Sequence, residues 1–125
     1  MVNAQIWLDQ NYPKKSRKET KVLNISSDEL RERKLLAKND FLEGKLDLRE
    51  FINLENLDCS NNVLTALNLS QNSKLVKLEC SNNLLTNLNF SSLNSPKLTE
   101  FYLVSNNWFQ QGLSYFGQFK KLEKL

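Results

Sequence analysis

Apolar residues recur with a fixed period along the C-terminal two thirds of the chain. Residues 54–70 (LENLDCSNNVLTALNLS) and 75–91 (LVKLECSNNLLTNLNFS) both fit LxxLxCSNNxLTxLNLS, with Phe90 replacing the last leucine. Leucines, cysteines and asparagines all match between the two segments, so each unit is a structural repeat. A unit this short cannot bury its own apolar face, which predicts that the units stack.

Partial copies flank the two complete units. A third begins at Leu98, slightly later than the period requires, and a fourth opens at Leu122. Upstream, residues 46–48 (LDL) match residues 67–69 (LNL) at the same spacing, and residues 22–25 (VLNI) predict an earlier strand. The repeats therefore extend in both directions from the two complete copies.

The repeated motif resembles that of the leucine-rich-repeat family, in the short form found in fungal proteins. The resemblance is clear from about residue 42 to residue 125. It implies an α/β-type solenoid, a right-handed leucine-rich-repeat arc with a parallel inner sheet. We expect the inner strands near residues 57–59, 78–80 and 101–103. The inward side chains of the first complete unit are then Leu57, Cys59, Leu64, Leu67 and Leu69.

A structural role is expected for the second asparagine of each unit. Asn62, Asn83 and Asn106 follow the strands, where an amide can hydrogen-bond backbone groups that a turn leaves unpaired. Cys59 and Cys80 replace an inward leucine, which predicts buried free thiols, because parallel neighbours orient poorly for a disulfide. Unpaired thiols and the lack of a signal peptide favour a cytoplasmic, intracellular location.

The N-terminal region, residues 1–21, predicts a capping helix and a basic connector ahead of the array at 22–125. Residues 3–11 predict a helix that is capped by Asn3 and buries Trp7 on the first strand. The basic residues that follow are Lys14, Lys15, Arg17, Lys18 and Lys21. No aromatic residues interleave with them, so a solvated connector is favoured, and nucleic-acid binding by this segment remains the alternative function.

The repeat pattern fails between residues 26 and 40, which predicts a helical insertion. Ser26 and Glu29 fit a capping box, and residues 28–38 predict a helix. Its apolar residues are Leu30, Leu35, Leu36 and Ala37. The insertion is a docking element, a neutral decoration or an artefact of gene prediction, and the sequence does not choose. Gly44 is expected to support a turn.

Composition narrows the function classes. Histidine is absent, which removes the commonest general base and metal ligand, and the two cysteines lack the spacing of a zinc site. No apolar run approaches the length of a membrane-spanning helix, so no membrane span is expected. The net charge of +3 neither demands nor excludes an acidic partner. We therefore expect no enzyme, no cofactor and no metal site, but a module that binds a protein.

The expected binding surface is the concave face of the inner sheet. In this register Asp58, Glu79 and Tyr102 form one column, whose carboxylates and aromatic ring suit a partner with basic and apolar groups. The candidate contact residues are Asp58, Glu79, Tyr102, Lys77, Glu100 and Asn56. Asp58 and Glu79 are formally an acid–base pair, but an open sheet offers neither a pocket nor a nucleophile.

The C-terminal end is expected to be truncated. Leu122 and Leu125 open a repeat that no cap follows, and residues 108–119 are rich in aromatic side chains. An uncovered apolar end predicts self-association through that end. The alternative is that the aromatic segment folds back as its own cap.

Overall fold

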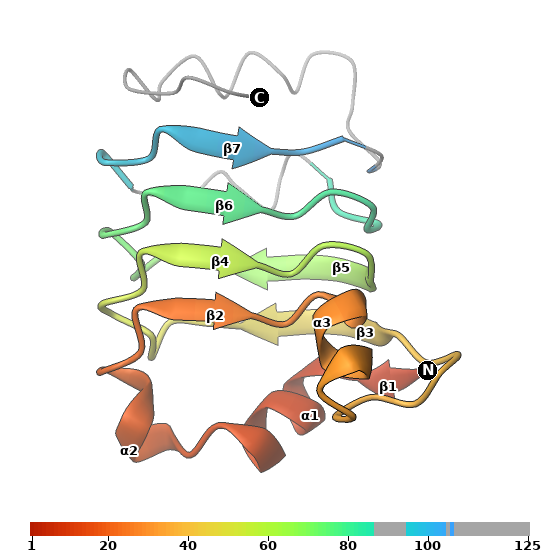
Figure 1. Ribbon diagram of the computed structural model, residues 1–125. Coiled ribbons are helices and arrows are strands. Elements are labelled where there is room, and N and C mark those ends of the chain that lie inside the picture. The colour runs from red at the N-terminus through yellow and green to blue at the C-terminus, as the bar shows by residue number, and fades with distance from the viewer. Residues whose placement is uncertain (87–94, 105, 107–125) are drawn as a thin grey trace.

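The computed structural model describes residues 1–86, 95–104 and 106. In this part of the chain, parallel strands form two sheets that lie in two layers (Figure 1). The front sheet has the order β2-β4-β6-β7 and the back sheet the order β1-β3-β5. The front strands are β2 (Val22–Asn24), β4 (Asn56–Asp58), β6 (Lys77–Glu79) and β7 (Glu100–Tyr102). The back strands are β1 (Val2–Asn3), β3 (Leu42–Asp47) and β5 (Val63–Asn68).

The front sheet has the register that the repeat predicts. Leu57 of β4 pairs with Leu78 of β6, its equivalent in the next unit, and Leu78 pairs with Phe101 of β7. Each observed strand begins one position earlier than predicted, a difference within the usual uncertainty of strand ends. Leu23 of β2 pairs with Leu57, so this connection is longer than the period and contains the insertion. The parallel stacking of the repeats is confirmed.

The back sheet was not predicted as a sheet, although its pairing follows from the repeat. Leu46 pairs with Leu67 and Asp47 with Asn68, each with its equivalent in the next unit. The prediction of a turn at Gly44 is wrong, because Gly44 lies inside β3 with a φ of 87°. The β3–β5 register shifts between Gly44 and Lys45, which face Leu64 and Ala66, so the glycine lies opposite a bulge whose extra residue, Thr65, belongs to β5.

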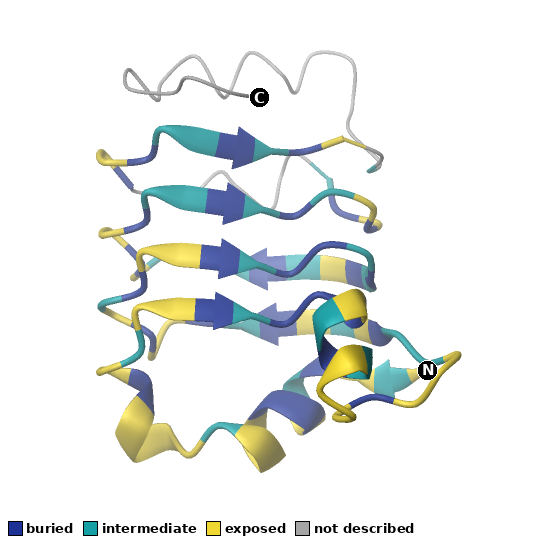
Figure 2. Cartoon of the chain, in the orientation of Figure 1, coloured by how far each residue is buried: buried dark blue, intermediate teal, exposed yellow. Residues whose placement is uncertain are grey.

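One apolar core lies between the two sheets. The five side chains predicted to point inward from the first complete unit are all buried. Leu78, Cys80 and Leu85 occupy the equivalent positions of the second unit and are also buried (Figure 2). Because every unit adds the same positions to the same core, the period of the sequence becomes a stack of buried rows.

The N-terminal helix forms as predicted, but it packs elsewhere. Helix α1 (Ala4–Asn11) begins at Asn3, whose side chain accepts a hydrogen bond from the Ile6 amide at 3.0 Å. The helix packs on β1 and β3 of the back sheet, and Trp7 is buried, with its indole donating to the Leu35 carbonyl at 3.1 Å. The helix lies there because it follows directly after β1, which pairs with the start of β3 in the back sheet.

Helix α3 is shorter than predicted. It covers Ser27–Glu32, with the Ser26 side chain accepting a hydrogen bond from the Glu29 amide as the capping box implies. Lys34 adopts a φ of 60°, and the Leu35 amide donates to the Leu30 carbonyl at 2.8 Å. This is a Schellman ending built on a lysine instead of a glycine. Leu30 and Leu36 are therefore buried, whereas Leu35 and Ala37 are exposed.

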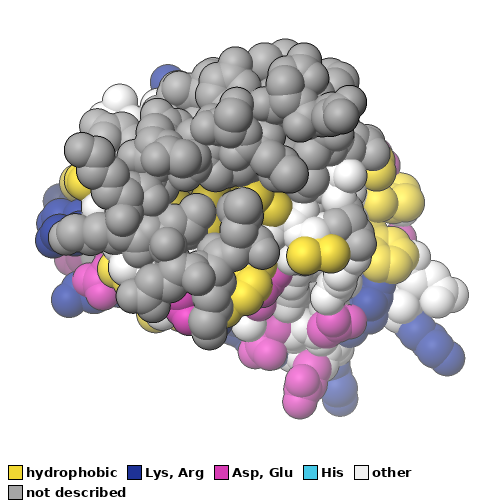
Figure 3. Space-filling model, turned by 90° about the horizontal axis from the view of Figure 1, so that it is seen from above, with side chains coloured by type: hydrophobic (Ala, Val, Ile, Leu, Met, Phe, Trp, Pro, Cys, Tyr) yellow, Lys and Arg dark blue, Asp and Glu magenta, His cyan; other side chains and the backbone are white. Residues whose placement is uncertain are grey.

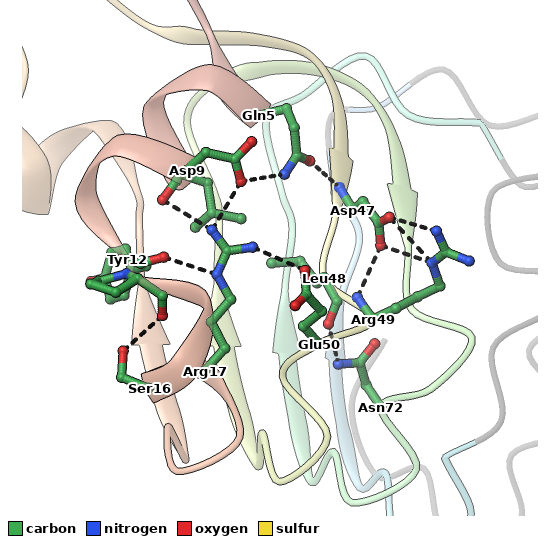
Figure 4. A network of polar contacts seen from close by, with 12 residues as sticks. Gln5, Asp9, Tyr12, Ser16, Arg17, Asp47, Leu48, Arg49, Glu50 and Asn72 are labelled. Carbon is green, nitrogen blue, oxygen red and sulfur yellow. Dashed lines mark hydrogen bonds and ion pairs between the residues drawn. The ribbon is translucent and has the colours of Figure 1, made fainter.

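The basic connector also differs from its prediction. Lys14–Arg17 form a short helix, α2, and Arg17 is buried while Lys14, Lys15, Lys18 and Lys21 are exposed. The Arg17 guanidinium reaches Asp9 at 2.9 Å and Glu50 at 3.6 Å, and lies 5.4 Å from the centre of the Phe51 ring (Figure 4). The interpretation of Arg17 as part of a solvated segment is therefore wrong.

Candidate functional site

Two rows of outward side chains cross the front sheet. The pairing aligns Val22, Asn56, Lys77 and Glu100 in a first row and Asn24, Asp58, Glu79 and Tyr102 in a second row. Between the rows, one inward side chain of each strand is buried. Alternation along the strands thus separates the core from the outward surface, as Figure 2 shows.

The predicted column is brought together by the register. Asp58 pairs with Glu79, and Glu79 pairs with Tyr102 on the next strand. Strand β2 extends the column by Asn24, which sequence reasoning missed. A signal was present, since Asn24 and Ser26 have the same spacing as Asp58 and Ser60.

The second row also stabilises the turns that follow the strands. Asp58 Oδ1 accepts hydrogen bonds from the Ser60 amide at 3.0 Å and the Ser60 hydroxyl at 2.6 Å. Asn24 Oδ1 makes the same two contacts with Ser26, at 3.2 and 2.9 Å. Glu79 is longer, and its Oε1 accepts a 3.4 Å bond from the Ser81 amide. The Glu79 carboxylate is therefore bound more weakly to the turn after its strand than the Asp58 carboxylate is.

Lys77 and Tyr102 form a contact between the two rows. The Lys77 ammonium lies 5.7 Å from the centre of the Tyr102 ring, within the range of a cation–π interaction. A hollow of about 160 Å³ lies beside them between β2 and β4, and Asn56, Asp58 and Lys77 contribute to its lining. The surface therefore offers a carboxylate, an ammonium group and an aromatic ring close to a shallow hollow.

The second asparagines form a ladder, the asparagine ladder, made of Asn62, Asn83 and Asn106, of which Asn62 and Asn83 are buried and Asn106 is half-buried. Asn83 Nδ2 donates to the Cys59 carbonyl at 3.0 Å and to the Cys80 carbonyl at 3.2 Å, and its Oδ1 accepts from the Leu64 amide at 3.0 Å. Each amide thus bonds the end of a front strand and the backbone of the preceding unit.

The other two members of the ladder repeat this arrangement. Asn62 accepts from the Leu42 amide at 3.0 Å and donates to the Ile25 carbonyl at 3.0 Å. Asn106 accepts from the Leu85 amide at 2.9 Å and donates to the Cys80 carbonyl at 2.9 Å. These contacts are structural, and they hold the strand ends that carry the outward rows.

Two further polar positions were missed from the sequence. The first asparagines, Asn61 and Asn82, adopt φ values of 58° and 57°, and Asn82 Nδ2 donates to Asn61 Oδ1 at 2.8 Å. At the opposite end of the units, buried Asn72 donates to the Leu48 carbonyl at 2.8 Å and to the Phe51 carbonyl at 2.9 Å. The repeat gave no signal for Asn72, because Phe51 occupies the equivalent position of the preceding unit.

The thiols are structural groups in this geometry. Cys59 and Cys80 are free and buried, as the sequence predicts. Burial raises the pKa of both thiols far above the ordinary value, so both stay protonated. A protonated, inaccessible thiol is not a nucleophile.

The described ranges contain no cluster of residues that could hold a metal ion. Within residues 1–86, 95–104 and 106, no three His, Cys, Asp or Glu residues are grouped to hold a metal ion. No helix of that part is long and apolar enough to cross a membrane. Seen from above, the visible Lys and Arg side chains lie mainly at the margins of the molecule, with Asp and Glu side chains between them (Figure 3).

The predicted C-terminal end lies outside the described residues. Leu122, Leu125 and the aromatic stretch at 108–119 all belong to it, so the expectation of an uncapped, self-associating end stays a prediction.

The chain matches no protein-family profile, no curated protein and no solved structure.

Proposed function

We propose that the protein is a non-catalytic binding module, a right-handed leucine-rich-repeat solenoid that presents a concave front sheet to a protein partner. The observation that carries the proposal is the alignment of two outward rows across four parallel strands. Such rows give a partner a continuous surface, and the structural asparagines keep their spacing fixed.

The chemistry of the rows favours a partner with basic and apolar groups. Asp58 and Glu79 are neighbours in the second row, and Tyr102 continues it. Aromatic side chains contribute strongly to protein interfaces when a partner covers them. The first row contributes Asn56, Lys77 and Glu100. The Lys77 ammonium lies 5.7 Å from the centre of the Tyr102 ring, so the two side chains present a cation and an aromatic ring together.

The test compares the same substitution on the two sheets. Glu79→Lys reverses a charge in the middle of the front sheet, and Glu43→Lys makes the identical change at an exposed position of β3 in the back sheet. Proteins captured from the native cell by the unaltered protein are identified and then measured in purified form against both variants. We expect Glu79→Lys to weaken binding by about tenfold or more, and Glu43→Lys by less than about twofold.

Thermal melts of both variants are the necessary control. Glu79→Gln removes the charge but keeps an oxygen for the Ser81 amide, so it separates the loss of charge from the loss of the turn contact. Equal loss of binding in the two Lys variants would contradict a front-sheet interface. Loss in Glu43→Lys alone would move the interface to the back sheet.

We further propose that the module acts inside the cell without a cofactor. The support is chemical, because two free thiols are typical of a reducing compartment.

A further inference from the structure

A hollow of about 500 Å³ lies in the insertion, away from the outward rows. It is lined by Arg31, Lys34, Leu35, Leu36, Ala37 and Lys38, and we call it the basic hollow. We propose that the basic hollow is a second docking site, which binds an acidic peptide segment that carries an aliphatic side chain.

The backbone around the basic hollow is held in place before any partner arrives. The Trp7 indole donates to the Leu35 carbonyl at 3.1 Å, and the Arg31 guanidinium donates to the Asp40 carbonyl at 2.8 Å. The same guanidinium lies 4.5 Å from the centre of the Phe41 ring. A preformed site loses little conformational entropy on binding, so a short segment suffices.

The charge of the basic hollow is of one sign. Among the described residues that line it, three are cationic and none is acidic. Arg31 has a partner in Asp28, 3.7 Å away, whereas Lys34 and Lys38 are exposed. These two lysines therefore provide the attraction for a carboxylate-rich segment.

The apolar part of the lining favours one of two anionic partners, an acidic peptide over a single-stranded nucleic acid. Leu35, Leu36 and Ala37 are aliphatic, and the lining contains no aromatic side chain from the part of the chain that the structure describes. Single-stranded nucleic acids gain much of their affinity by stacking bases on aromatic rings, which this lining does not offer. An aliphatic side chain flanked by carboxylates matches both parts of the lining, so the geometry favours a peptide.

The probe is a synthetic, fluorescently labelled peptide in which glutamates flank a leucine. Its affinity is measured by anisotropy for the unaltered chain and for a variant with Lys34→Gly and Lys38→Gln. Glycine suits the positive φ of residue 34, so this change removes the charge without disturbing the turn. The control variant, Lys14→Gln with Lys15→Gln, removes the same charge from exposed positions in α2.

We expect the Lys34 and Lys38 changes to weaken binding by about tenfold and the control changes by less than about twofold. A peptide with glutamine in place of glutamate should not bind. The Glu79→Lys variant should bind the probe as the unaltered chain does, which separates this site from the front-sheet surface. Equal loss in both lysine pairs, no binding of the acidic peptide, or stronger binding of a single-stranded oligonucleotide than of the peptide would overturn the proposal.

Discussion

Neighbouring asparagines in the repeated Ser-Asn-Asn sequence have different roles. Asn82 is exposed and adopts the left-handed conformation, which asparagine tolerates better than most residues. Asn83 is buried, and its amide bonds backbone groups of two successive units. One residue type thus satisfies two separate demands of the same turn, namely its backbone angle and its buried polar groups.

Replacing the buried asparagine is expected to be costly. Asn83→Ala leaves the Leu64 amide and the Cys59 carbonyl without this partner, and we expect a loss of about 1–3 kcal/mol in the free energy of unfolding. Asn82→Gly is the control, because glycine accepts the φ of 57° and only an exposed hydrogen bond is lost. Urea unfolding should place this control within about 0.5 kcal/mol of the unaltered chain. Similar losses in the two variants would show that the ladder does not depend on the buried amide.

The burial of Arg17 could not be predicted from the sequence. Five basic residues occur between positions 14 and 21, four lysines and one arginine, and their spacing does not distinguish Arg17 from the others. The Arg17 guanidinium bonds Asp9 and the backbone of α1 nearby, and it also meets Glu50 and Phe51, which are far away in the sequence. Local composition carries no information about such partners, so the sequence predicted exposure for all five.

Among the elements, both predicted helix starts and the end of α1 at Asn11 agree with the structure, whereas the end of α3 does not. Asn3 and Ser26 cap α1 and α3 through their own side chains, so the sequence shows both starts directly. Lys34 ends α3 in a conformation that glycine usually adopts, and no sequence rule identifies a lysine there. Gly44 was identified as a special position, but its place opposite a bulge depends on the pairing with β5.

Helices α1 and α2 are joined by a contact that acid should weaken. The Arg17 hydrogen bond, and then that of Gln5, lower the pKa of Asp9 below its ordinary value. A carboxylate with a lowered folded-state pKa stabilises the fold above its unfolded-state pKa, and this contribution is lost as the pH falls through the folded-state pKa. The stability lost in Asp9→Asn should therefore be present near neutral pH and shrink in acid.

Chemical unfolding at about pH 6 and about pH 3 measures this difference. Glu19→Gln removes an exposed carboxylate from the same region and serves as the control. A stability difference for Asp9→Asn that stays constant between the two pH values would mean that the Asp9–Arg17 pair does not contribute through its charge.

At the scale of the whole molecule, the fold is a stack closed at one end by the N-terminal segment. Helices α1 and α2 lie beneath β2 and β3, at the end of the stack where both sheets begin (Figure 1). The period of the sequence predicted the order of the front strands. It did not predict β1, because Val2, which pairs with Leu42, lies outside the periodic part of the chain. Repetition is informative about stacking, whereas the closure of the stack depends on a segment that does not repeat.

Substitution of Leu78 tests whether each unit of the stack is stabilised mainly by the units next to it. It is fully buried between Leu57 and Phe101 in the front sheet, so Leu78→Ala should lower the free energy of unfolding by about 2–5 kcal/mol. Leu84→Ala makes the same change at a side chain that is 45% exposed, and its cost should stay under about 1 kcal/mol.

The location of the lost hydrogen-exchange protection in Leu78→Ala is more informative than the total loss of stability. In a stacked array each unit contacts only its neighbours, so a cavity at Leu78 should raise local opening most in β4, β6 and β7. Hydrogen exchange measured by mass spectrometry should then show a larger loss of protection in these strands than in α1 and β1, which are held by separate contacts with β3. An equal loss of protection at both ends would show that the stack unfolds as one cooperative unit. In that case the N-terminal segment would be part of the same core and not only its cap.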